Sequence, residues 1–356
     1  MDFPNGWEEC LLTALSEAET AVAFLPSSPA SLAALSRLHG TCAERLRAAA
    51  SENGGGDQEV CDDRYAQGPT GAQEWPRYSR RVARLGSLEW RGAYYCDAVA
   101  AETLRLSASY RPRPPPASIR FDSAPARWCL SLPTFATRFE VTGEDSLEAA
   151  RRLVALAPGP RPLVLNMANP DRPGGGFLDG SAGQEEELCR RSTLFCDLAE
   201  AVYPLAERGG VVSPDVVVIR GAGPSYLELE QRFHVAIATA AAPIRPNLSS
   251  EASAREYEAL MGAKVEALLL AGAAQGYRRL VLSAWGCGAF HNPPEVVARL
   301  FRAALGRPPF ARAFEHVVFA VFDRWGTEHN LPEFERAFAD LVAGPAGAVD
   351  RTASEA

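Results

Sequence analysis

Apolar and polar positions alternate in two ways along the second half of the chain. Short apolar runs predict strands, at 139–141, 163–167, 215–220, 233–238, 279–284 and 316–322. Longer stretches with apolar residues every three or four positions predict helices, at 145–157, 184–202, 252–274, 293–305 and 331–342. Because strands alternate with helices, the pattern indicates an α/β fold with a largely parallel or mixed sheet.

The amino-terminal third of the chain has a different pattern. Residues 1–50 carry leucines at helical spacing and predict a helical appendage, and the polar, glycine-rich stretch 51–73 predicts a flexible linker. An accessory segment at 75–135 contains a proline cluster that interrupts regular structure. The main domain is expected at 136–342, and the small polar tail at 343–356 is expected to be disordered.

The stretch Leu163–Leu194 is the most informative part of the chain. Its apolar strand leads to Asn169, then to a turn between two prolines and the triple glycine Gly174, Gly175 and Gly176. Ligands of open α/β sheets bind at the carboxyl ends of strands, where an amide can both donate to and accept from a sugar diol. Since glycines lack a Cβ, sugar and phosphate can lie directly against this backbone.

An acidic helix start follows this loop. Seven residues after the triple glycine, Gln184, Glu185 and Glu186 open the next predicted helix and bring two adjacent carboxyl groups toward the loop. Taken singly, each feature has an ordinary interpretation, because glycine runs often form flexible turns and acidic residues often complement a helix dipole. The combination at this spacing is far more specific than either feature alone.

A second predicted strand, at 279–284, also ends in a glycine loop before a helix. The loop consists of Gly286, Cys287, Gly288, Ala289 and Phe290. Its backbone N–H groups and the following helix start can bind a diphosphate without any lysine, which matters because neither loop has a basic cluster. A thiol nucleophile at Cys287 is disfavoured, since no histidine is adjacent and a small buried cysteine is common packing.

The triple glycine, seven residues and QEE together resemble the signature of the poly(ADP-ribose) glycohydrolases. The residues after QEE and the sequence AWGCGAF at 284–290 resemble the corresponding helix and second ligand loop of the microbial-type branch. Residues 101–110 resemble its accessory segment, so that the similarity covers about Trp75 to Leu341. The resemblance implies a macrodomain-like three-layer α/β/α sandwich with a mixed sheet, preceded by a helical accessory segment.

The resemblance also implies roles for individual residues. Glu186 matches the catalytic acid of the family, Glu185 the neighbour that contacts the terminal ribose, and Asn169 the ribose-binding amide. The loop near the diphosphate matches Gly174, Gly175 and Gly176, and Gln184 belongs to the same substrate-binding set. The loop that wraps the phosphates matches Gly286, Cys287, Gly288, Ala289 and Phe290, with Phe290 near the adenine or its ribose.

The implied reaction is hydrolysis of the ribose–ribose O-glycosidic bond of poly(ADP-ribose), without a metal or other cofactor. The leaving ribose oxygen must receive a proton as an oxocarbenium-like centre develops. Glu186 is the expected proton donor and then the base for the attacking water, and Glu185 is expected to orient the ribose. The helix start favours an ionised carboxylate, whereas an acid must carry a proton, and the sequence leaves this balance open.

Other functions stay open at this point. The same pocket could belong to a hydrolase that removes single ADP-ribose units from proteins, to a non-catalytic ADP-ribose-binding module, or to a scaffold. The expected partners are poly(ADP-ribose) or ADP-ribosylated proteins, with ADP-ribose as the product. The resemblance implies reversal of ADP-ribosylation, with the DNA damage response as its setting.

Composition limits the remaining classes. A chain of 356 residues with 47% hydrophobic residues can build a substantial core, and a net charge of -8 argues against a general nucleic-acid-binding surface. Eight cysteines without paired CxxC spacing are typical of reduced intracellular thiols. The acidic amino terminus lacks a secretory signal and no run reaches membrane-spanning length, so we expect a cytoplasmic or nuclear protein that is not secreted and does not contact a membrane.

Five further residues carry weaker expectations. His234 and His316 lie within apolar strands and are expected to be satisfied core or edge histidines, and no cluster has metal-ligand spacing. Trp285 could stack on a base or brace its loop. His291 departs from the small residue that the family favours there, and Asn247 stays unassigned because its spacing from the preceding proline is unusual.

Overall fold

The computed structural model describes residues 99–100, 103–104, 106–107, 109–110, 119–121, 134–156, 159–179, 181–223, 226–322 and 329–342. The predicted appendage, linker and tail lie outside these residues, as does most of the accessory segment. The chain divides into two compact units, residues 1–111 with 174–200 and residues 112–173 with 201–356.

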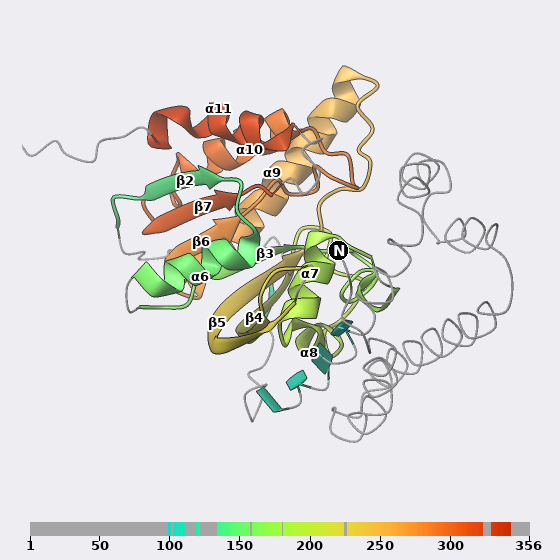
Figure 1. Ribbon diagram of the computed structural model, residues 1–356. Coiled ribbons are helices and arrows are strands. Elements are labelled where there is room, and N and C mark those ends of the chain that lie inside the picture. Colours follow the sequence, from blue (N-terminus) through green and yellow to red (C-terminus); the bar gives the residue numbers. More distant parts are fainter. Residues whose placement is uncertain are drawn as a thin grey trace, which may run out of the picture. The chain divides into compact units, whose positions relative to one another are not determined.

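The second unit is built on one seven-stranded sheet (Figure 1). Its strands are β1 (Ile119–Phe121), β2 (Arg138–Thr142), β3 (Leu163–Met167), β4 (Gly210–Arg220), β5 (Glu228–Ala240), β6 (Arg279–Leu282) and β7 (His316–Ala320). They lie in the order β1-β4-β5-β3-β6-β7-β2, with β2, β7, β6, β3 and β5 parallel and β4 antiparallel to both of its neighbours. The mixed sheet expected from the sequence is confirmed.

Helices cover both faces of this sheet. They are α6 (Ser146–Leu156), α9 (Glu251–Ala274), α10 (Pro294–Leu305) and α11 (Asn330–Val342). Leu163, Leu280 and Val317 pack into one core with side chains of α9, α10 and α11. Successive strand residues point to opposite faces, so the equally buried Val164 and Val281 face the side that α6 covers. The result is a three-layer α/β/α arrangement.

Aromatic rings join two of these layers. The ring of Phe319 on β7 lies 5.4 Å from Phe301 of α10, and 5.3 and 4.5 Å from Phe334 and Phe338 of α11. All four side chains are fully buried. Large apolar side chains of this kind contribute about 2–3 kcal/mol each on burial, so the packing gives a rigid base for the loops at the carboxyl ends of the strands.

The first unit contains a short η1 (Phe177–Asp179), α7 (Gln184–Arg191) and α8 (Leu194–Leu198). The single helix predicted at 184–202 is therefore wrong in extent, because Ser192 interrupts it with φ -149° and ψ 176°. The Ser192 hydroxyl donates to the carbonyl of Leu188 at 2.7 Å and accepts from the N–H of Leu194 at 3.3 Å. A side chain that bonds to nearby backbone competes with the helical pattern in this way.

None of the helices in the described part of the chain is long and apolar enough to cross a membrane.

Candidate active site

The triple glycine of the first unit forms a tight loop over α7 and α8. Gly174 and Gly175 have φ of +70° and +58°, a region that side chains other than glycine rarely adopt. A Cβ at Gly174 would lie 2.8 Å from the ring of Phe195, which itself stacks on Phe177 at 5.0 Å. The loop therefore packs so closely on its aromatic base that only glycine fits.

Both carboxylates of the QEE sequence face this loop. The N–H of Gly176 donates to Oε1 of Glu186 at 2.8 Å. A Cβ at Gly175 would lie 2.5 Å from that same oxygen and 2.8 Å from Oε2 of Glu185. The two carboxylates thus converge on the backbone of Gly175, with Glu185 almost fully buried and Glu186 partly accessible.

The start of α7 also fixes the position of Glu186. Gly183 is the N-cap residue and has no side chain that could cap the helix, and Glu186 is the third helical residue. Its Oε2 occupies the place that a Cβ of Gly183 would need. Glutamate at this position commonly folds back over the helix start, where it satisfies the local positive potential. Glu186 therefore has a structural role beside any chemical one.

Arg190 holds the segment between the glycines and the helix. Its side chain is fully buried, and its Nη2 donates to the carbonyl of Ser181 and lies 3.5 Å from Oε1 of Glu187. The hydroxyl of Thr103 donates to the carbonyl of Arg190 at 2.7 Å. The accessory segment and the segment after the triple glycine are thereby tied to one helix.

Cys189 lies beneath the same loop. A Cβ added at Gly174 would lie 3.4 Å from the sulfur of Cys189. Burial raises the pKa of the Cys189 thiol well above its ordinary value, and the nearby charges of Glu185 and Glu186 raise it further. This cysteine is consequently a neutral packing group and not a nucleophile.

The second glycine loop belongs to the other unit and is closed by Asn292. Nδ2 of Asn292 donates to the carbonyls of Pro243 at 2.8 Å and Gly286 at 3.0 Å, and lies 3.5 Å from that of Phe290. Asn292 is 1% exposed, and its Oδ1 is buried without a hydrogen-bond partner. Gly286 has φ +76°, and a Cβ there would lie 2.5 Å from the amide of Asn292. The buried amide therefore sets the shape of the loop.

Trp285 braces this loop from the core. It is 1% exposed, its Nε1 donates to the carbonyl of Ala240 at 3.2 Å, and its ring packs on Phe301 at 6.4 Å. Of the two functions considered for Trp285, bracing therefore holds and base stacking does not. The half-buried Cys287 places its sulfur 3.8 Å from the carbonyl of Trp285.

Asn169 organises the turn after β3. Its Oδ1 accepts from the N–H groups of Asp171 and Arg172, both at 2.9 Å. Its amide oxygen therefore holds the turn directly after the strand. Asn166, on the strand itself, is fully buried and donates to the hydroxyl of Thr239 at 3.2 Å.

Comparison with known proteins now identifies the family. A family model for the catalytic domain of microbial-type PARG, the poly(ADP-ribose) glycohydrolases, matches residues 99–221. The chain is 31% identical to the poly(ADP-ribose) glycohydrolase of Thermomonospora curvata, over 68% of this chain and 98% of that one, with a TM-score of 0.59. The chain belongs to the microbial-type poly(ADP-ribose) glycohydrolase family.

Two further structures agree with this membership. The Thermomonospora curvata glycohydrolase bound to the inhibitor ADP-HPD is 37% identical, with a TM-score of 0.53, over 57% of this chain and 80% of that one. The Deinococcus radiodurans glycohydrolase in complex with ADP-ribose is 34% identical, with a TM-score of 0.51, over 59% and 86%. No curated protein sequence matches the chain. The protein is therefore an enzyme of this glycohydrolase family, and the macrodomain-like fold expected for it is confirmed.

Within the glycohydrolase, the structure brings the residues of each predicted loop together. Gly174–Gly176 meet Glu185 and Glu186 in one unit, and Gly286–Phe290 form a compact loop in the other. Gln184 is the first residue of α7. The catalytic and substrate-binding roles of these residues stay predictions.

Sequence reasoning missed Asn292, Arg190 and Arg245, each of which contacts a predicted loop or the segment beside it. Arg245 donates its backbone N–H to the carbonyl of Phe290 at 2.8 Å, although 45 positions separate the two in sequence. No local pattern marks such contacts, because they depend on which strand ends become neighbours.

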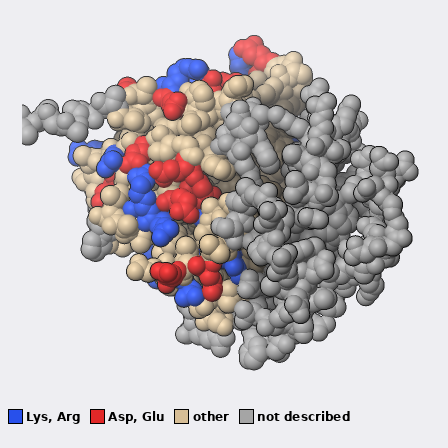
Figure 2. Space-filling model, in the orientation of Figure 1, with Lys and Arg blue, Asp and Glu red and all other residues tan. Residues whose placement is uncertain are grey.

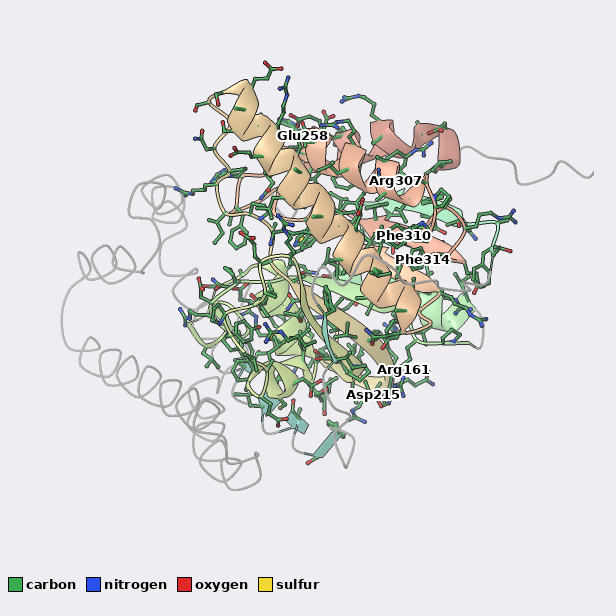
Figure 3. All side chains as sticks on the ribbon, turned by 180° about the vertical axis from the view of Figure 1, so that it is seen from behind. Arg161, Asp215, Glu258, Arg307, Phe310 and Phe314 are labelled. Carbon is green, nitrogen blue, oxygen red and sulfur yellow. The ribbon has the colours of Figure 1, made fainter. Side chains whose placement is uncertain are left out.

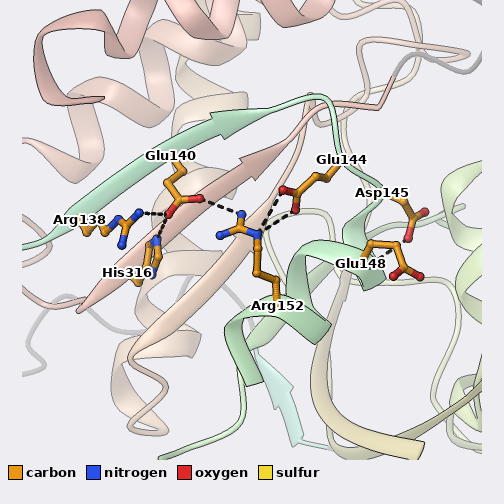
Figure 4. A network of polar contacts seen from close by, with 7 residues as sticks. All are labelled: Arg138, Glu140, Glu144, Asp145, Glu148, Arg152 and His316. Atoms are coloured by element: carbon orange, nitrogen blue, oxygen red, sulfur yellow. Dashed lines mark hydrogen bonds and ion pairs between the residues drawn. The ribbon is translucent and has the colours of Figure 1, made fainter. Parts of the chain in front are cut away.

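The two histidines of the apolar strands are satisfied, as expected. His234 Nδ1 lies 2.6 Å from Oδ1 of Asp215, which also pairs with Arg161 at 3.0 Å (Figure 3). His316 Nε2 lies 2.8 Å from Oε1 of Glu140 (Figure 4). Among the described residues, no group of three or more His, Cys, Asp or Glu side chains could hold a metal ion.

Charges of both signs are interspersed on the described part of the face in Figure 2. Figure 4 shows a group of paired charges at close range, in which Arg138 and Arg152 flank Glu140 at 2.8 and 2.7 Å. Paired charges of this kind leave little net field to attract a long polyanion.

Proposed function

We propose that this enzyme hydrolyses the ribose–ribose O-glycosidic bonds of poly(ADP-ribose) and releases ADP-ribose. The observation that carries the proposal is the position of Glu186, whose Oε1 accepts from the N–H of Gly176 at 2.8 Å beside the carboxylate of Glu185. The family relatives that supply the substrate class are the glycohydrolases described above, one of them in complex with ADP-ribose.

In this proposal Glu186 moves the proton. As its acid form, Glu186 protonates the leaving ribose oxygen while positive charge develops at the anomeric carbon. The resulting carboxylate then takes a proton from the attacking water, which restores the acid. Gly176, Gly175 and Gly183 hold this carboxylate in place through one N–H group and two positions without a Cβ.

The other predicted residues bind and orient the substrate. The buried carboxylate of Glu185 is proposed to bind the hydroxyl groups of the terminal ribose, and the amide of Asn169 to contact a ribose. Backbone N–H groups of the Gly286–Phe290 loop are proposed to bind the diphosphate. Peptide donors can bind phosphate without a basic side chain, and this loop contains no lysine or arginine.

The test is ADP-ribose release from purified poly(ADP-ribose) by the wild type and by Glu186→Gln, with ADP-ribose binding measured for both. We expect Glu186→Gln to lower release by about 100- to 10,000-fold while binding persists, because only the mobile proton is lost. Glu187→Gln is the matched control: it makes the same change one residue later, where the carboxylate lies near Arg190 and not over the glycines.

Two results would contradict the proposal. If Glu186→Gln released ADP-ribose as fast as the wild type, Glu186 would not be the group that transfers the proton. Binding of ADP-ribose by a wild-type protein that releases none from the polymer would favour single protein-linked ADP-ribose units as the substrate, or a binding function alone.

A further inference from the structure

The turn that follows β5 lies against the second glycine loop. The carbonyl of Pro243 accepts from the buried amide of Asn292 at 2.8 Å, and Ala242 fills the space over Gly286. Two residues further on, the N–H of Arg245 donates to the carbonyl of Phe290 at 2.8 Å. These contacts hold the turn against the second glycine loop from Gly286 to Phe290.

Arg245 occupies an unfavourable backbone conformation in this turn. Its φ is +48°, in the left-handed region, while its side chain is exposed. His291, directly after Phe290, has φ +56° and is also exposed. Non-glycine residues in this region cost of order 1 kcal/mol, and such residues cluster at ligand-binding sites. Two of them flanking Phe290 point to a role for this end of the loop.

The chemistry of the turn fits a nucleotide polymer. Ile244 is 50% exposed, and the next residue, Arg245, is also exposed. An apolar surface and a cation are therefore adjacent in sequence. A guanidinium binds phosphate through two parallel N–H donors and keeps its charge at all relevant pH values. Neither glycine loop contains a lysine or arginine of its own.

The position of Arg245 separates it from the base of the loop. The Gly286 end is occupied by Ala242 and by the amide of Asn292. Arg245 meets the loop through its backbone N–H at Phe290, the last residue of the loop. Its exposed side chain therefore starts beside the end of the loop opposite Gly286.

We propose that Arg245, with Ile244 beside it, binds a phosphate group of poly(ADP-ribose) outside the ADP-ribose unit that the Gly286–Phe290 loop holds. This contact favours polymer over a single ADP-ribose. The inference rests on the proposed function, because it takes ADP-ribose as the ligand of that loop. In a chain of net charge -8, one well-placed cation is an effective way to retain a polyanion.

The test measures binding in the Glu186→Gln background, so that the polymer is not consumed. Its ligands are purified poly(ADP-ribose) of defined length and free ADP-ribose. Adding Arg245→Gln is expected to weaken polymer binding about tenfold, which is the scale of one charged hydrogen-bonded contact, and to change ADP-ribose binding less than twofold. The slope of log affinity against log salt should become shallower by about 0.7, and Arg245→Lys should recover part of the affinity.

Two further variants separate binding from folding. Arg245→Gly relieves the left-handed backbone, so the free energy of unfolding should rise while polymer affinity falls. If Arg245 had only a structural role, stability and polymer affinity would change in the same direction. Arg151→Gln on α6 removes an exposed arginine that lies 3.9 Å from the carboxylate of Glu148. It should leave polymer binding unchanged.

The outcomes are distinct. An equal loss for polymer and ADP-ribose, or no loss for either, would overturn the inference. A wild type that binds polymer in an Arg245-dependent way but does not cleave it would support the inference and refute the proposed hydrolysis. Binding of neither ligand by the Glu186→Gln protein would overturn both.

Discussion

At the scale of single residues, the first glycine loop depends on the missing Cβ of Gly175 as much as on the carboxylates of Glu185 and Glu186. Gly175 combines a φ of +58° with two carboxylate oxygens at 2.5 and 2.8 Å from where a Cβ would lie. Contacts under 3.0 Å force the carboxylates to move. Glu186 would then lose its short bond to the N–H of Gly176.

Gly175→Ala is accordingly expected to lower ADP-ribose release at least tenfold and to reduce the free energy of unfolding by about 1–2 kcal/mol, the cost of a left-handed residue with a Cβ. Steady-state release and urea unfolding measure the two effects. Gly276→Ala is the matched control, because Gly276 has φ +79° but nothing within 4 Å of an added Cβ. It should show the stability loss alone. Full activity of Gly175→Ala would mean that the position of Glu186 does not limit the reaction.

At the scale of elements, one amide joins the end of β5, the loop after β6 and the start of α10. α10 begins at Pro294 without a side-chain cap, so the preceding Asn292 is free to serve the loop. Its amide orientation is determined, since the opposite one would set Oδ1 against the carbonyls of Pro243 and Gly286. The loop is therefore fixed by a contact between elements.

Asn292→Asp should reduce the free energy of unfolding by about 2–3 kcal/mol, because a buried carboxylate would face carbonyl oxygens without donors. Binding of ADP-ribose should weaken with it. Asn247→Asp makes the same chemical change at an exposed residue whose Oδ1 accepts from the N–H of Ser249 at 3.0 Å, and should leave stability within about 0.5 kcal/mol. Urea unfolding and calorimetric titration measure both quantities. Equal stability of the two variants would show that the buried amide is not needed.

At the scale of the whole molecule, a group of charges joins β2, β7 and α6 (Figure 4). Burial lowers the pKa of His316, and this effect outweighs the charge of Glu140, which raises it. Burial alone would raise the pKa of Glu140, but its hydrogen bond to Arg152 and the charges of Arg152, His316 and Arg138 together lower it. Both groups then bind protons more weakly in the folded protein than in the unfolded chain.

The sign of the pH dependence follows. Stability from His316 is complete above its unfolded pKa of about 6.5 and declines as the pH falls below that value, because the unfolded state takes up the proton first. The contribution of Glu140 to stability is lost only at lower pH, below the ordinary pKa of a glutamate. Urea unfolding between pH 7.5 and 5 should therefore show a decline that is smaller in His316→Asn. An identical decline in the wild type and in His316→Asn would contradict this account.

The amino-acid sequence by itself predicted most of the elements and the residues of the two glycine loops. Strand β3 and helices α9, α10 and α11 lie within one residue of their predicted bounds, since alternation and helical spacing are local properties that burial reinforces. The triple glycine and QEE are close in sequence, so their meeting over α7 depends on a short chain segment. The family was recognisable from the same local spacing.

Only the tertiary structure decided what surrounds these loops. Asn292 meets Pro243 across 49 positions, Thr103 meets Arg190 across 87, and His316 meets Glu140 across 176. The pairing of β2 with β7 brings His316 beside Glu140, and tertiary packing makes the other two contacts. No periodicity in the sequence encodes either arrangement. The break in the predicted helix at Ser192 has a similar cause, since one hydroxyl competes successfully with the helical pattern. Residue spacing thus specified the chemical groups of this enzyme, and packing specified where those groups lie.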